Sequence, residues 1–176
     1  RQLHSLGWRK PIFIVDDNFI GNPKRTKETL QNMITLEKEL GYIFPKYTEL
    51  TMRLSDDVPF MKELRSLFRE TTFTTNFIGV ETNNILSLQE TGKKQNLRGE
   101  RTLQEKLEFI SRETGGGVMM GMIHGFDNDT AESAKLLAEF INSTHSPIVM
   151  VGLMNALPYT ALWDRLKREG RLREES

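Results

Sequence analysis

Short apolar runs alternate with amphipathic stretches along the whole chain. The runs have strand length and are continuous, as IFIV at 12–15 and IVMVGL at 148–153 illustrate. Continuous apolar runs are typical of strands that are covered on both faces. The pattern therefore predicts five strands. They are expected at Pro11–Val15, Tyr47–Arg53, Asn76–Glu81, Val118–Ile123 and Pro147–Leu153.

Between these runs, apolar residues recur at the three- and four-residue spacing of helices. Asn22 followed by Pro23 is a helix start signal, and Thr102 with Glu105 forms a capping box. A short helix is expected within NILSLQETG, and the last helix is expected to bury Leu162, Trp163 and Leu166. The longer helices are predicted from Asn22 to Gly41, at Pro59–Glu70, after Thr102, at Thr130–Asn142 and at Thr160–Arg168.

Strands that alternate with helices predict right-handed crossovers and a parallel sheet. A dinucleotide-binding open sheet should carry a glycine-rich turn between a strand and its helix. The glycine cluster at 115–117 instead precedes a strand, where we predict a plain connector. We therefore predict one α/β domain over residues 1–176, a partial (β/α) barrel of about five parallel strand–helix units.

Composition narrows the function classes. The chain has 24 basic and 24 acidic residues, so no net charge attracts nucleic acid or anionic membranes. No apolar run approaches the ~20 residues of a membrane-spanning helix. Cysteine is absent, which excludes disulfides and iron–sulfur ligation by this chain and agrees with a cytoplasmic location.

Polar residues follow several predicted strands, where parallel α/β proteins place their chemistry. These residues suit a ligand with an ammonium group, hydroxyls or a polar heterocycle, or a hard metal ion. A turn is the alternative role for Asp17 or Asn18 alone, and a hydrogen-bonded side chain is the alternative for His124. The basic segment 92–101 is interpreted as a solvated loop, with binding of a carboxylate or a partner as the alternative.

Four blocks in the chain resemble the radical S-adenosylmethionine (SAM) enzymes, and in particular the group with an upstream cobalamin-binding domain. The blocks are FIVDDNFIGN, FIGVET followed by SLQETGKKQN, GMIHGFDNDT, and VGLMNALPYTALWDRLKREGRL. They cover almost the whole chain in the expected order, and Gly41–Asp57 matches least. The resemblance implies the second to sixth units of a partial barrel, with SAM and a 4Fe–4S cluster at the strand ends. Reductive cleavage of SAM at this place implies an oxidoreductase. The cleavage forms a 5′-deoxyadenosyl radical, which abstracts hydrogen from a small-molecule substrate.

The resemblance also implies residue roles. Asp16, Asp17 and Asn18 match the place that binds the methionine amino group of SAM, where charge-assisted hydrogen bonds offset the desolvation of carboxylates. Glu81 matches a position that contacts the ribose or the methionyl group. The positions implied for adenine are the backbone of Ile123, His124 and Gly125, and the flanking residues Leu153, Asn155 and Ala156. We expect Asp17, Glu81 and His124 to share one pocket.

The chain departs from the family at several points. The motif CxxxCxxC is expected N-terminal of Arg1, in upstream parts of a longer protein, so this chain alone is expected to be inactive. Tyr159 and His124 stand where the family usually has a glycine and a small apolar residue. The strand edge near Pro11 is expected to be exposed and to favour self-association. Methylation, ring closure and rearrangement all stay open as outcomes.

Two other functions stay open. A degenerate barrel would use the same scaffold only to bind a ligand or a partner. A magnesium-binding receiver-like signalling domain is suggested by IVDDN at 14–18. However, the third predicted strand ends in Glu81 instead of a phosphorylatable aspartate, and the fifth predicted strand does not end in a lysine.

Overall fold

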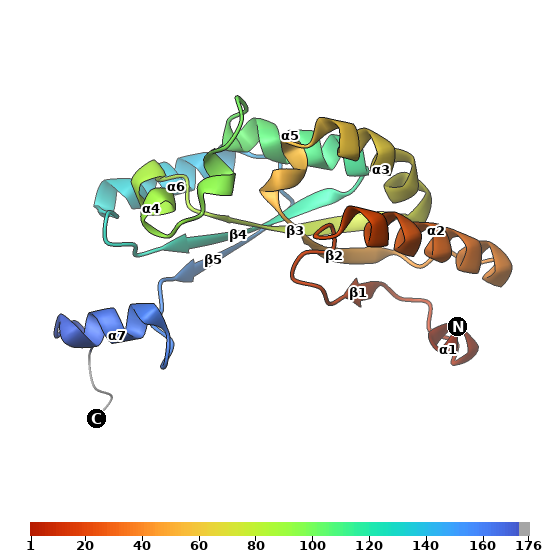
Figure 1. The fold of residues 1–176 in the computed structure, drawn as a ribbon, viewed down its shortest axis with the longest axis horizontal. Coiled ribbons are helices and arrows are strands. Elements are labelled where there is room, and N and C mark those ends of the chain that lie inside the picture. Colours follow the sequence, from red (N-terminus) through yellow and green to blue (C-terminus); the bar gives the residue numbers. More distant parts are fainter. Residues whose placement is uncertain (173–176) are drawn as a thin grey trace.

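The computed structural model describes residues 1–172 and contains one five-stranded parallel sheet in the order β1–β2–β3–β4–β5 (Figure 1). The strands are β1 (Ile12–Ile14), β2 (Lys46–Leu50), β3 (Phe73–Glu81), β4 (Gly117–His124) and β5 (Ile148–Leu153). The α-helices are α1 (Gln2–Ser5), α2 (Pro23–Leu40), α3 (Val58–Thr71), α4 (Ile85–Glu90), α5 (Leu103–Thr114), α6 (Ala131–Ser143) and α7 (Ala161–Arg168). Two 3₁₀ helices are η1 (Met52–Ser55) and η2 (Lys94–Leu97).

All of the helices between β1 and β5 lie on one face of the sheet, while α1 and α7 lie near its two ends (Figure 1). A doubly wound sheet would carry helices on both faces and would reverse its strand order. Strands in sequential order with helices on a single face are the arrangement of a barrel wall. The predicted partial (β/α) barrel is therefore confirmed.

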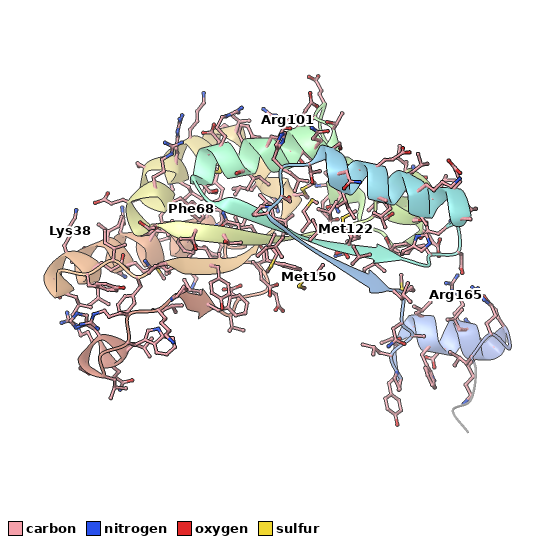
Figure 2. The ribbon with its side chains drawn as sticks, turned by 180° about the vertical axis from the view of Figure 1, so that it is seen from behind. Lys38, Phe68, Arg101, Met122, Met150 and Arg165 are labelled. Carbon is pink, nitrogen blue, oxygen red and sulfur yellow. The ribbon has the colours of Figure 1, made fainter. Side chains whose placement is uncertain are left out.

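The hydrophobic core lies between the sheet and its helix layer. Phe68 on helix α3 of this layer is fully buried, and Met122 on strand β4 of the sheet is also buried (Figure 2). Alternate side chains point to the other face, where Met150 is 53% exposed. Phe13 and Tyr47 also lie on that side and stack with ring centroids 4.8 Å apart. We call this second side the open face of the sheet.

The predicted helix boundaries follow local capping chemistry. The Asn22 side chain accepts a hydrogen bond from the backbone N–H of Arg25 at 3.1 Å, which begins α2. Gly41 ends that helix with φ +62°, a conformation that glycine adopts without strain. Gly115 ends α5 in the same way, so the glycine cluster is the predicted connector between α5 and β4.

Two predictions about elements are wrong. The second strand ends at Leu50, and Arg53 lies in η1, because the chain turns there to bury Met52 and Leu54 in the core. Helix α7 has no buried residue, although its apolar residues were expected to be buried. It follows the last strand and lies away from the helix layer, so the layer cannot cover it (Figure 1). Within residues 1–172 no helix is both long and apolar enough to cross a membrane.

Candidate functional site at the exit edge

The C-terminal ends of the five strands form one edge of the sheet, which we call the exit edge. Glu81 ends the central strand β3 there, with φ +69°. The register against β4 shifts between Gly79 and Glu81. A Cβ atom on Gly79 would lie 2.7 Å from Oε1 of Glu81. The Glu81 carboxylate therefore folds back over Gly79 on the open face, and only glycine leaves room for it.

Lys93 meets this carboxylate from the segment that follows α4. Its Nζ donates a hydrogen bond to Oε1 of Glu81 at 2.9 Å. Asn96, which is 3% exposed, donates from Nδ2 to the carbonyl oxygen of Val80 at 2.9 Å and to that of Gly79 at 3.4 Å. These bonds hold residues 93–96 against the end of β3. The interpretation of 92–101 as a solvated loop is therefore wrong for Lys93 and Asn96.

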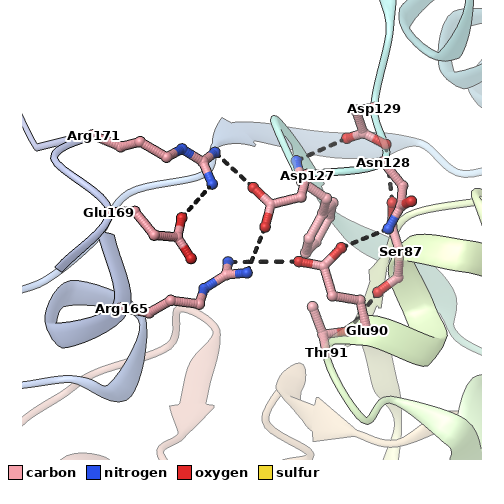
Figure 3. A network of polar contacts seen from close by, with 10 residues as sticks. Ser87, Glu90, Thr91, Asp127, Asn128, Asp129, Arg165, Glu169 and Arg171 are labelled. Carbon is pink, nitrogen blue, oxygen red and sulfur yellow. Dashed lines mark hydrogen bonds and ion pairs between the residues drawn. The ribbon is translucent and has the colours of Figure 1, made fainter. Parts of the chain in front are cut away.

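Asp129 organises the loop that follows β4. Its side chain is 3% exposed, and its Oδ2 accepts hydrogen bonds from the N–H groups of Gly125 and Phe126 at 2.9 and 3.0 Å. Its Oδ1 accepts from Asn84 Nδ2 at 3.0 Å. The same oxygen accepts from Ser87 Oγ at 3.1 Å (Figure 3). Burial alone would raise the pKa of Asp129, but these donors outweigh it and hold the pKa below the usual value.

The His124 side chain and the Glu81 carboxylate lie on opposite faces of the sheet. Its Nδ1 is 3.4 Å from Oδ2 of Asp129. Because side chains alternate along a strand, His124 points to the same side as buried Met122, toward the helices. The Glu81 carboxylate lies on the open face instead. The expectation that Asp17, Glu81 and His124 share one pocket is therefore wrong, although the backbone of residues 123–125 still reaches the exit edge.

The first strand leads into a turn. Oδ1 of Asp16 accepts a hydrogen bond from the N–H of Asn18 at 2.9 Å, and the Asn18 carbonyl accepts from Gly21 at 2.8 Å. Asp16, Asp17 and Asn18 are all exposed. Asp16 therefore has a turn role, of the kind that was the alternative for Asp17 or Asn18 alone. Asp17 follows β1 at the exit edge, and β1 lies two strands away from β3, which carries Glu81.

A cavity of about 590 Å³ lies between the ends of β4 and β5, α4 and α7. It brings together Gly125 and Ala156, two of the residues implied for adenine. The His124 carbonyl accepts a hydrogen bond from the N–H of Met154 at 2.7 Å, which joins the two strand ends. Leu153 is 80% exposed, Asn155 is exposed, and Ile123 is half-buried.

An ion-pair network closes one side of this cavity. Arg165 of α7 donates to Asp127 at 2.5 Å, and Arg171 donates to the same carboxylate at 2.6 Å (Figure 3). Arg165 also lies 3.6 Å from Glu90. The hydrogen bond from Arg171, together with Arg165, lowers the pKa of Asp127. This network attaches α7 to the rest of the molecule.

Sequence reasoning missed Lys93, Asn96 and Asp129 as site residues. Lys93 and Asn96 belong to a polar segment whose composition is that of a surface loop. Asp129 sits just before the Thr130 helix cap, so it resembles an ordinary turn residue. The only sequence signal for these three residues is that they lie close to the ends of predicted strands. Many other residues share that property, so it could not select these three.

The described residues do not fit a bound metal centre. Residues 1–172 contain no group of three or more histidine, aspartate or glutamate side chains that could hold a metal ion. The whole chain contains no cysteine, so it supplies no thiolate for an iron–sulfur cluster. The polar groups that these residues supply at the exit edge are carboxylates, an ammonium and backbone atoms.

Comparisons in sequence relate the chain to methyltransferases. An uncharacterised methyltransferase of Synechocystis sp. is 39% identical over 174 residues, which are 99% of this chain. The hopanoid C-2 methylase of Rhodopseudomonas palustris is 36% identical over 173 residues, which are 96% of this chain. The chain spans 31% of the length of each of these curated relatives. No family profile matches the chain.

A comparison of structures agrees with this relationship. The radical SAM methyltransferase TsrM of Kitasatospora setae, solved with cobalamin and a 4Fe–4S cluster, matches with a TM-score of 0.71 at 15% identity. A second TsrM structure holds tryptophan and a SAM analogue and matches equally well. The match covers 96% of this chain and 32% of the first TsrM chain. The chain is thus homologous to methyltransferases in sequence and has the fold of a radical SAM methyltransferase.

Proposed function

We propose that this chain is the SAM-binding part of a radical SAM methyltransferase of the cobalamin-associated group. It would supply the second to sixth strand–helix units of the barrel, as one domain over residues 1–176. The observation that carries the proposal is the position of Glu81, whose carboxylate lies on the open face at the end of the central strand. A carboxylate there can accept hydrogen bonds from the methionyl or ribose groups of a sulfonium nucleoside.

The comparisons support this proposal and narrow the outcome that the sequence left open. Both curated relatives are named methyltransferases or methylases, so methylation is favoured over ring closure and rearrangement. The prediction of an oxidoreductase fits a methyltransferase less well. The small-molecule substrate, the upstream domains as partners, the cytoplasmic location and self-association through the β1 edge stay predictions.

The roles proposed for the remaining site residues rest on their places at the exit edge. Asp17 and Asn18 would accept hydrogen bonds from the methionine amino group, with Asp16 shaping the turn that presents them. The backbone of Ile123, His124 and Gly125 would contact adenine. Leu153, Asn155 and Ala156 would flank the same ring from β5, since β4 and β5 are joined at their ends.

The proposal includes SAM as a ligand of this chain, but it does not include the iron–sulfur cluster as one. SAM fits the carboxylates and backbone groups of the exit edge. The cluster does not fit the residues of this chain, because thiolate ligands are missing, so we derive no step through it. In the proposed full-length protein its cysteines and a cobalamin domain would lie outside this chain, which alone would bind SAM weakly and would be inactive.

The test is SAM binding to the full-length protein, measured by calorimetric titration. We expect Glu81→Gln and Asp17→Ala each to weaken binding by about 1–3 kcal/mol, the scale of a polar group left unpaired. Glu139→Gln, on the exposed side of α6, is the matched control and should leave the affinity unchanged. Unchanged affinity in both site variants would remove the assignment.

Two alternatives make different predictions. A degenerate barrel that only binds a ligand or partner would be favoured by a full-length protein without the CxxxCxxC motif. A receiver-like domain belongs to the doubly wound sheets with strand order 2-1-3-4-5, which differs from the sequential order found here. Labelling of an aspartate by acetyl phosphate would support that alternative, and we expect none.

A further inference from the structure

Glu49 of β2 is a partly buried glutamate on the open face of the sheet. Its neighbours Thr48 and Leu50 are buried on the core side, so strand alternation directs the Glu49 side chain to the other face. Among the side chains that the structure describes, none forms an ion pair or a hydrogen bond with this carboxylate. The Glu49 backbone is nevertheless held, because its carbonyl oxygen accepts a hydrogen bond from the N–H of Phe19 at 3.1 Å.

The open face around Glu49 is aromatic. Tyr47, two residues earlier on the same face, stacks on Phe13 of β1 with an angle of 5° between the rings. Phe77 lies opposite Glu49 in the register of β2 and β3, and its ring leans the other way, over Gly121 of β4. A Cβ atom on Gly121 would lie 2.7 Å from Cζ of Phe77, so only glycine leaves room for the ring there. Glu49 thus stands between aromatic residues and stays partly exposed.

Other carboxylates near the ends of the sheet have partners. Glu37 pairs with Lys46, and Asp129 accepts hydrogen bonds from two backbone N–H groups. A carboxylate that loses its hydration near apolar side chains is disfavoured unless such a partner offsets the loss. Glu49 has no described partner, so folding gives no reason for its charge. Departures of this kind from local packing rules are expected where a residue serves a ligand.

We propose that Glu49 binds an ammonium group of the substrate, whose apolar part lies on the aromatic residues of the open face. An ammonium donates charge-assisted hydrogen bonds to a carboxylate and is attracted to the faces of aromatic rings. Phe77, which lies opposite Glu49, precedes Glu81 by four residues on β3, which is about 13 Å along a strand. A substrate bound at Glu49 can therefore extend toward SAM at the exit edge. This inference rests on the proposed function and adds to it a substrate class, an apolar body with an ammonium group.

The experiment compares two probes by calorimetric titration of the full-length protein. Tryptamine joins an indole ring to an ammonium group, and tryptophol has a hydroxyl group in place of the ammonium. We expect wild type to bind tryptamine about tenfold or more tightly than tryptophol, and Glu49→Gln to lose that preference. Glu49→Asp keeps the charge and should retain part of the preference. Glu139→Gln, which removes an exposed carboxylate from α6, should retain all of it.

The outcomes separate this inference from the proposed function. Wild type that binds both probes equally, or does not bind tryptamine, overturns the inference, as does a preference that survives in Glu49→Gln. SAM is titrated into the same proteins, and Glu49→Gln should bind it as wild type does; weaker SAM binding would assign Glu49 to SAM instead. A wild type that fails to bind SAM overturns the proposed function by a result that does not depend on the probes.

Thermal unfolding adds a measurement that does not require a ligand. Because the Glu49 carboxylate has no described partner, Glu49→Gln should melt at the same temperature as wild type or at a higher one. A glutamate that served the fold would instead leave the variant with a lower melting temperature. That result would overturn the assignment of Glu49 to a ligand.

Discussion

Two lysine–glutamate pairs lie at opposite edges of the same sheet and differ mainly in burial. At the N-terminal edge, Lys46 of β2 pairs with Glu37 of α2 at 2.5 Å, and both side chains are 5% exposed. At the exit edge, Lys93 pairs with Glu81 at 2.9 Å, with side chains 43% and 16% exposed. The same two residue types are therefore closed off from solvent at one edge and open to it at the other.

The buried pair makes several further hydrogen bonds with the backbone, although Oε2 of Glu37 has no hydrogen-bond partner. Lys46 Nζ also donates to the carbonyls of Phe44 at 2.7 Å and Thr71 at 2.6 Å, and Oε1 of Glu37 accepts from the N–H of Phe44 at 2.9 Å. It thus connects the ends of α2 and α3 with the start of β2. Burial lowers the pKa of Lys46, although Glu37 acts in the opposite direction.

The difference in burial indicates that the two edges of the sheet have different roles. In barrel proteins the N-terminal edge contributes stability and the C-terminal edge carries the chemistry. Both side chains of the Lys46–Glu37 pair are almost completely buried, while those of the Glu81–Lys93 pair are partly exposed. Burial, and not residue type, therefore separates a structural ion pair from a candidate binding pair.

Loss of Lys46 should give the largest effect. Lys46→Met leaves Glu37 buried without its partner, so we expect the free energy of unfolding to fall by about 3–5 kcal/mol in urea titrations. Adding Glu37→Leu in the same chain should recover most of that loss, because no uncompensated charge remains. A loss below about 1 kcal/mol for Lys46→Met would place this pair with ordinary surface pairs.

Asp129 tests whether the exit edge also contains a stability residue. Asp129→Asn replaces an acceptor of two backbone N–H groups, so unfolding should become easier by about 1–3 kcal/mol at pH 7. The folded pKa of Asp129 lies below its ordinary value of 3.8. Its contribution is therefore present above that value and is lost as the pH falls through the folded pKa. Urea titrations at neutral and acidic pH should show a smaller acid-induced loss in the variant than in wild type.

Gly79→Ala isolates the position of the Glu81 carboxylate. The new Cβ would lie 2.7 Å from Oε1 of Glu81 and would displace it from the open face. We expect SAM affinity to fall by about tenfold with a smaller change in stability. Gly152→Ala on β5 is the matched control, since its Cβ would approach no atom closer than 4.0 Å. Equal affinities for the two variants would show that the carboxylate position is unimportant.

The attachment of α7 should give the smallest effect. Arg165→Gln removes contacts with Asp127 and Glu90 that are partly exposed, so we expect a loss below about 1 kcal/mol. The loss should shrink further as salt screens the charges. Arg168→Gln on the same helix, at an exposed position, is the control. A large, salt-independent loss would mean that α7 is held as firmly as the N-terminal edge.

The sequence alone predicted the type and order of the main elements. Periodic apolar residues, the Asn22 cap and the glycines at 41 and 115 act through neighbours in the chain, so they can be read locally. The same local signals predicted that polar residues gather at the strand ends. They predicted less well how far a strand extends, since the end of β2 depends on burial of Met52 and Leu54 in the core.

The tertiary structure alone decided which polar groups meet. Lys93 reaches Glu81 only because Asn96 anchors its segment and Gly79 makes room. Similarly, the side of β4 to which His124 points followed from strand alternation once the strand's burial was known. Ion pairs and ligand sites join residues that are distant in the chain, and their geometry depends on packing and backbone conformation. Local sequence patterns do not determine that packing. The helices and strands could therefore be predicted from the sequence, whereas the contacts between them could not.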